Sequence, residues 1–215
     1  MSELSVNIEE YEYFRFSDSN DPSYNDAGLP WSRPYEYCWA LNAVRRAGGS
    51  NPFLRKSKAV LNSAWGYEGC HLQFRQALDQ EATTLHTDLL TYDDMLATKI
   101  AAYNQYPTFI LNLADYYEPF ESSFDVSLCI SVVEHMPVAV TRQAMANLVR
   151  YTKPGGLVGI TFDLPSESGE WIVRECGKGR MPVDDGTLLS GTTSVLPNPR
   201  YGHLRVGRVL LRRMP

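Results

Sequence analysis

The chain has 215 residues, 44% hydrophobic and 21% charged, which suits one globular α/β domain and excludes a disordered or fibrous composition. Its formal net charge of -5 provides no overall positive field, so neither nucleic acid nor an anionic membrane is expected as a partner. Four scattered cysteines without a C-x-x-C pair indicate neither a zinc site nor a disulfide framework, and no metal is expected. A reduced, cytoplasmic protein is the simplest interpretation.

The N-terminal segment, residues 1–30, is acidic and rich in turn-forming residues, and it lacks the basic and apolar regions of a signal peptide. We expect an irregular arm or lid there, followed by a single domain over residues 31–215. No apolar run approaches the ~18 residues that a membrane-spanning helix needs. Nothing in the sequence indicates an oligomeric state.

From residue 31 onward, helical and strand patterns alternate. The first predicted helix, within residues 31–49, carries Tyr35, Trp39, Leu41 and Val44 at near-helical spacing, and Pro34 suits its first turn. Further helices are predicted at residues 71–81, 93–105 and 140–152, the last with Val140, Met145, Leu148 and Val149 near one face. Strands are predicted within residues 58–69, which also hold a glycine-containing turn, and at residues 83–88, 108–115, 124–131, 157–164 and 203–213.

Strands that alternate with helices pair in parallel through right-handed crossovers. The sequence therefore predicts a doubly wound, mostly parallel, Rossmann-like α/β sheet with helices on both faces. The last strand, residues 203–213, is expected as an antiparallel edge strand. In such a sheet, ligands bind beyond the carboxyl ends of the strands, near the point where the strand order reverses.

Two strings give this pattern a family likeness. SVVEHMP, residues 131–137, follows the fourth strand, and KPGG, residues 153–156, forms a tight turn before the fifth. With the segment around RPYEYCWAL, residues 33–41, they resemble class I S-adenosylmethionine-dependent methyltransferases, in particular the type 11 group. The resemblance covers about residues 34–164 and implies S-adenosylmethionine as cofactor, with the helix at 33–41 covering it.

The turn after the first strand departs from the pattern of this family, which has an acid followed by a glycine-rich run. Here Asn62 replaces the acid, Ala64 stands where the first glycine would be, and Gly66 remains. Asn62 can donate and accept hydrogen bonds but offers no full negative charge to a cofactor amine. Trp65 adds bulk, and Glu68 is one acid that could supply the missing charge. A turn without a ligand is the structural alternative.

Asp88 ends the second predicted strand, about 22 residues after Gly66, where a carboxylate can accept both ribose hydroxyls of a nucleoside. Its alternative role is to cap the helix that follows, and Asp93 or Asp94 could compete for the ribose.

Asp115 closes the third predicted strand, and the resemblance implies that it bonds the amine of adenine. Tyr116 could flank the ring, because aromatic faces stack on heterocycles. A turn aspartate is the alternative for Asp115. Ser131, at the end of the fourth strand, completes the expected cofactor contacts.

His135 and Asp163 are the candidate catalytic residues. His135 has the intrinsic pKa of a general base at neutral pH, and the resemblance places the Glu134–His135 pair beside the methyl-transfer site. Its alternative role is architectural, with methyl transfer driven by alignment alone. Asp163 ends the fifth strand and is expected to face the same crevice.

The leading functional hypothesis is methyl transfer to a small-molecule acceptor. The alternative is a methyltransferase-fold protein that has lost catalysis and serves as a binding or assembly module. Its basis is the four residues that crowd or neutralise the cofactor loop: Asn62, Ala64, Trp65 and Glu68. A different adenosine-containing ligand is a third hypothesis. NAD is not expected, because G-x-G-x-x-G is absent.

Overall fold

The computed structural model describes residues 33–47, 57–63, 71–89, 108–176, 189–197 and 205–215. The α-helices are α2 (Arg33–Ala47), α3 (His71–Glu81), α5 (Val138–Tyr151) and α6 (Glu167–Cys176). The strands are β1 (Ala59–Ser63), β2 (Thr83–Asp88), β3 (Phe109–Ile110), β4 (Phe124–Ile130), β5 (Thr152–Leu164), β6 (Leu189–Pro197) and β7 (Arg205–Arg213). Two short 3₁₀ helices, η4 (Glu118–Phe120) and η5 (Val133–His135), flank β4.

The seven strands of the described residues form one sheet in the order β3-β2-β1-β4-β5-β7-β6. β1 pairs in parallel with both β2 and β4, so the strand order reverses beside β1. β5 continues the parallel part, and β7 and β6 complete the sheet as antiparallel neighbours. This confirms the predicted mostly parallel, doubly wound sheet and places the expected ligand crevice at the carboxyl ends of β1 and β4.

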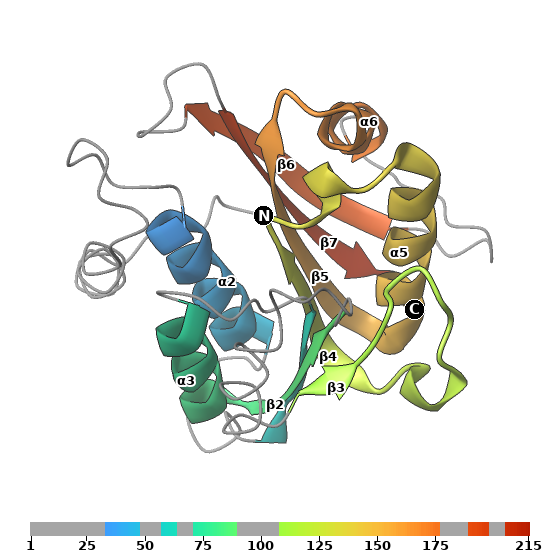
Figure 1. Ribbon diagram of the computed structural model, residues 1–215. Helices are drawn as coiled ribbons and strands as arrows, with labels where there is room; N and C mark the ends of the chain where they lie inside the picture. The colour runs from blue at the N-terminus through green and yellow to red at the C-terminus, as the bar shows by residue number, and fades with distance from the viewer. Residues whose placement is uncertain (1–32, 48–56, 64–70, 90–107, 177–188, 198–204) are drawn as a thin grey trace, which may run out of the picture.

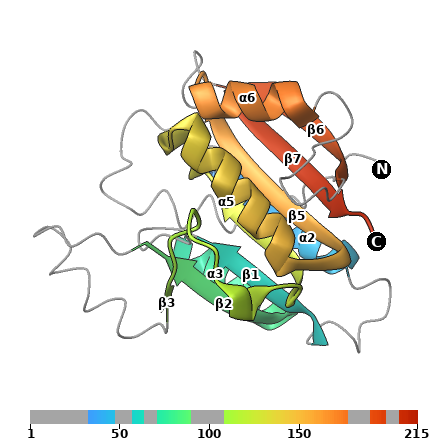
Figure 2. The same ribbon diagram turned by 90° about the vertical axis from the view of Figure 1, so that its right-hand side faces the viewer.

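Helices cover both faces of the sheet. α2 and α3 lie on one face, and α5 and α6 lie on the other (Figures 1 and 2). Because successive strand residues point to opposite faces, Val60 packs with α2 and α3, while the next residue, Leu61, packs with α5 and α6. The sheet therefore separates two apolar cores, each closed by its own pair of helices.

The helix α2 is buried almost all round, which the predicted aromatic stripe did not anticipate. Trp39 is 4% exposed, and Tyr37 stacks on Phe74 of α3 with ring centroids 4.1 Å apart. Tyr35, one of the predicted stripe residues, is instead 39% exposed in the first turn. The helix thus packs against α3 as well as against the sheet, and its first turn reaches the end of the sheet.

The C-terminal strands correct the predicted edge. β7 is antiparallel, as expected, but it lies inside the sheet between β5 and β6, so β6 is the edge strand of the described sheet. Arg208 on β7 is accordingly 4% exposed. Arg213 donates hydrogen bonds to the carbonyl oxygens of Val149 and Arg150, and so binds the C-terminal end of α5.

The third strand is much shorter than predicted. It contains only Phe109 and Ile110, because Asn112 starts a turn: its side-chain oxygen accepts the N–H of Ala114 at 3.1 Å, and its carbonyl accepts the N–H of Asp115 at 3.0 Å. The helix predicted at 140–152 runs from 138 to 151, with Val140 exposed. The predicted N-terminal arm and the helix at residues 93–105 lie outside the described residues.

Candidate functional site

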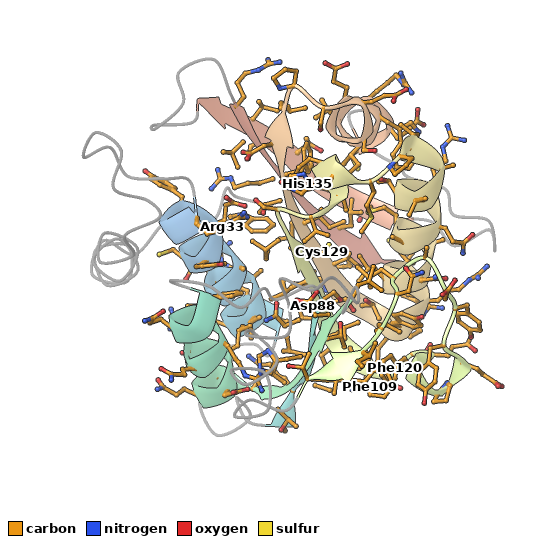
Figure 3. The ribbon with its side chains drawn as sticks, viewed as in Figure 1. Arg33, Asp88, Phe109, Phe120, Cys129 and His135 are labelled. Carbon is orange, nitrogen blue, oxygen red and sulfur yellow. The ribbon has the colours of Figure 1, made fainter. Side chains whose placement is uncertain are left out.

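Four neighbouring parallel strands bring most of the predicted site residues to one edge of the sheet. Asp88 ends β2, Ser131 follows β4, and Asp163 lies near the end of β5. His135 ends the short helix η5 that follows β4. Figure 3 shows Asp88, Cys129 and His135 along the middle of the molecule, between α2 and α5, with Arg33 at the start of α2 beside them. Ala64 and Gly66, which the sequence predicts in a turn after β1, lie outside the described residues.

Asn62 is buried within the sheet and takes part in a hydrogen-bonded chain. Its side-chain Nδ2 lies 3.1 Å from Nδ1 of His86, whose Nε2 lies 2.9 Å from Oδ1 of Asp79 on α3. Burial lowers the pKa of His86, so the ring is neutral at pH 7, accepts from Asn62 and donates to Asp79. The amide of Asn62 thus joins β1 to β2 instead of projecting beyond the strand end.

Asp88 lies partly exposed at the carboxyl end of β2. One carboxylate oxygen accepts the N–H of Leu89 at 2.7 Å, and its backbone carbonyl accepts the N–H of Leu111 at 3.0 Å. Its charge reaches Cys129 on β4, where it contributes, after burial and Glu134, to raising the pKa of the thiol. The carboxylate is therefore close to the switch point, as the ribose role predicted from the sequence requires.

Ser131 has a backbone φ of 48°, a left-handed conformation that few residues other than glycine adopt. Its N–H donates to the carbonyl and the hydroxyl of Thr161, at 2.9 and 3.1 Å. Its own hydroxyl donates to Oε2 of Glu36 at 2.6 Å. These contacts fix the backbone of Ser131 where the chain turns away from β4.

Glu36 is a site residue that the sequence analysis missed. It comes from the first turn of α2, is fully buried, and accepts hydrogen bonds from the hydroxyls of Ser131 and Thr161. Arg33, one helical turn earlier, places its Nη1 3.5 Å from the same carboxylate oxygen. A buried carboxylate with these partners ties α2 to the ends of β4 and β5. The RPYEYCWAL string contained both charged residues, but their burial depends on this packing.

The fold places the side chains of Glu134 and His135 in different environments. The side chain of Glu134 is only 5% exposed, whereas that of His135 is 78% exposed, and Nε2 of His135 lies 4.0 Å from Oε1 of Glu134. Burial raises the pKa of Glu134 to about 8; Arg33 counteracts this, and the charges of Glu36 and Asp163 add to it. The sequence predicted His135 as the catalytic member of this pair. Glu134 is the member that the fold buries, and burial raises its pKa.

Asp115 and Tyr116 lie apart from this edge. Asp115 is exposed in the turn after β3, and its carbonyl accepts the hydroxyl of Tyr151, the residue directly before β5 begins. Tyr116 is 42% exposed, stacks on Tyr151 with centroids 6.1 Å apart, and donates its hydroxyl to Glu121 at 2.8 Å. The structure therefore does not bring these two residues together with Asp88 and Ser131.

Among the described residues, no group of three or more histidine, cysteine, aspartate or glutamate side chains could hold a metal ion. No helix in the described part of the chain is long and apolar enough to cross a membrane. The three described cysteines, Cys38, Cys129 and Cys176, are buried and form no disulfide within the described part of the chain.

The comparisons with known proteins agree with this fold. The type 11 family model, described as "Methyltransferase domain", matches residues 69–160. A solved structure of a putative sarcosine dimethylglycine methyltransferase from Galdieria sulphuraria is 13% identical, with a TM-score of 0.51, and the match covers 75% of this chain and 79% of that one. Phosphoethanolamine N-methyltransferase 1 of Haemonchus contortus, in complex with S-adenosylhomocysteine, is 15% identical with a TM-score of 0.54, over 99% of this chain and 50% of that one.

A third structure, the [4+2]-cyclase SpnF, is 10% identical with a TM-score of 0.52, and the match covers 82% of each chain. No curated protein matches the chain by sequence. The chain thus has the class I methyltransferase fold, and its residues 69–160 match the type 11 methyltransferase domain model, in line with the resemblance of its sequence.

Proposed function

We propose that this protein transfers the methyl group of S-adenosylmethionine to a small-molecule acceptor at the carboxyl ends of β1, β2, β4 and β5. The observation that carries the proposal is the methyltransferase domain match over residues 69–160, which contains Asp88 at the end of β2. A similar fold occurs in a protein described as a cyclase, so the fold alone does not define the reaction. The reaction must be inferred from the side chains at the carboxyl ends of these strands.

These side chains fit an adenosyl cofactor. Asp88 is a partly exposed acid at the strand end where a ribose would bind, and the hydrogen bonds of Ser131 hold the neighbouring backbone in place. When bound, the cofactor would supply an electrophilic methyl group on sulfonium. The protein would contribute alignment for in-line displacement, while α2, held by Glu36, would help to exclude water.

In this proposal Asp115 and Tyr116 contribute less to cofactor binding than the resemblance implied, because both lie beside Tyr151. Ala64 and Gly66 keep their proposed place in the loop against the methionine end. Asp163 remains a candidate polar contact for the acceptor. The exposed His135 remains a candidate base, which would act only once an acceptor lies over it.

The acceptor is proposed to be a small molecule, since the net charge of -5 disfavours a nucleic acid. The free thiols are compatible with a reducing, cytoplasmic location, which we also propose.

The alternative is a catalytically inactive module, and one observation favours it: Asn62 replaces the usual acid, and its amide bonds His86. Calorimetric titration with S-adenosylhomocysteine separates the two. Micromolar binding that Asp88→Asn weakens supports the enzyme, whereas no binding by a folded sample, checked by circular dichroism, supports the module.

A further inference from the structure

The carboxylate of Glu134 lacks the partners that a buried charge needs. Its side chain is 5% exposed, and among the described residues no donor outside Glu134 itself is within hydrogen-bond distance of either oxygen. Nε2 of His135 lies 4.0 Å from Oε1 of Glu134 and belongs to a side chain that is 78% exposed. The ionised form of a carboxyl group in this condition is costly unless a ligand supplies the missing donor or cation, and without one the group stays protonated.

The surroundings of Glu134 are acidic. The charged groups that act on it are Arg33 and Glu36 from α2 and Asp163 from β5, and Glu134 in turn acts on the thiol of Cys129 on β4. Glu36 already pairs with the guanidinium of Arg33 at 3.5 Å. Glu134 thus lies within reach of the negative charges of Glu36 and Asp163, which favour a positively charged ligand group beside it.

The position of the cluster is distinct from that of the proposed ribose contact. β2 and β5 are separated by β1 and β4 in the sheet, so their ends are about 14 Å apart at ~4.8 Å per strand. A nucleoside held by Asp88 on β2 therefore lies away from Asp163 on β5. A ligand group over Glu134 and Asp163 would therefore lie beside the proposed ribose contact and would not coincide with it.

From this geometry we propose that Glu134 binds the ammonium group of the methyl acceptor, so that the acceptor is an amine. The inference rests on the proposed function above. An acceptor ammonium donates to the Glu134 carboxylate and passes one proton to it, which leaves a neutral amine. The amine lone pair then forms the new N–C bond while the C–S bond of the methyl donor breaks and its electron pair stays on sulfur. The methylated ammonium leaves, and Glu134 returns its proton to water.

The test measures amine binding to the complex with S-adenosylhomocysteine by ligand-observed NMR. The probes are n-butylamine and benzylamine, each paired with the alcohol of the same shape. The variants are Glu134→Gln, which removes the charge, Glu134→Asp, which keeps it, and Glu170→Gln, a matched control at an exposed position of α6. Circular dichroism and the affinity for S-adenosylhomocysteine establish that each variant is folded and retains its cofactor site.

We expect the wild type to bind at least one amine and to prefer it to its alcohol by tenfold or more. Glu134→Gln should abolish that preference, Glu134→Asp should retain part of it, and Glu170→Gln should leave it unchanged. Amine affinity should also rise about tenfold per pH unit between pH 6 and 7, because the pKa of Glu134 is about 8 and the ionised form is the one that binds. A purely structural role would not produce this amine-over-alcohol discrimination.

Equal binding of amine and alcohol by the wild type, or an amine preference that survives Glu134→Gln, would overturn the proposal. So would a Glu134→Gln variant that loses affinity for S-adenosylhomocysteine but not for methylthioadenosine, which lacks the amino acid portion. That result would assign Glu134 to the amino group of the cofactor. If the folded wild type binds neither adenosine compound, the proposed function fails, and the amine titration, run without cofactor, still decides whether Glu134 binds ammonium.

Discussion

Replacing Glu36 with alanine tests the reasoning that a buried carboxylate holds α2 onto the sheet. The substitution removes the acceptor for the hydroxyls of Ser131 and Thr161 and the counter-charge of Arg33. Hydrogen bonds to a charged acceptor are worth about 1.5–3 kcal/mol each, and breaking a buried pair costs about 3–5 kcal/mol. We therefore expect the free energy of unfolding to fall by about 3–5 kcal/mol.

The assay is urea unfolding followed by circular dichroism, with thermal unfolding alongside. For a domain of this size, 4 kcal/mol corresponds to a loss of roughly 8–16 °C in the melting temperature. Glu170→Ala, at an exposed position on α6, is the matched control and should change stability by less than about 0.5 kcal/mol.

A double-mutant cycle then isolates the contact across α2 and β5. Thr161→Val removes one hydroxyl donor while keeping the shape of the side chain, so its cost should shrink once Glu36 is already alanine. We expect a coupling energy of about 1.5–3 kcal/mol. Strictly additive losses, or a Glu36→Ala cost below about 1 kcal/mol, would refute the structural role assigned to this carboxylate.

Four further substitutions test other parts of the molecule. Asp88→Asn should weaken S-adenosylhomocysteine by about 1–3 kcal/mol in calorimetric titration, whereas Asp115→Asn, in an exposed turn beside α5, should change affinity by less than threefold. Gly156→Ala should destabilise by about 1–3 kcal/mol in urea, because an added Cβ would lie 2.6 Å from a threonine methyl and 2.8 Å from a carbonyl oxygen. Glu134 has a pKa raised from 4.5 to about 8, so its contribution to stability is present below about pH 4 and is lost as the pH rises to about 8, by up to about 1.4 kcal/mol per unit. Urea unfolding of wild type and Glu134→Gln from pH 5 to 8 should therefore show the wild type losing stability relative to the variant, and parallel curves would contradict this.

The elements that could be predicted from the sequence are those whose signal is local. The helix at 71–81 and the strand at 83–88 match α3 and β2 residue for residue, because each carries its own hydrophobic period. The edge strand β6 was missed because LSGTTSVLP is short of apolar residues and is held in the sheet by its pairing with β7. The predicted length of β3 was wrong for a different reason. The apolar run continues past Ile110, but the side chain of Asn112 accepts a backbone hydrogen bond that turns the chain.

The chemistry at the crevice depends on contacts that no local pattern contains. Glu36 meets Ser131 and Thr161 across 95 and 125 residues of sequence, and only the docking of α2 over β4 and β5 brings them together. The same docking contributes to the setting of Glu134: Arg33 and Glu36 act on it from α2, whereas the adjacent His135 remains in solvent. Glu134 and His135 can both take part in acid–base chemistry, but the fold buries the side chain of the first and exposes that of the second. It follows that variants which loosen α2, with Glu36→Ala the most direct, should lower the pKa of Glu134 as well as the stability of the fold, since burial is the largest cause of its shift.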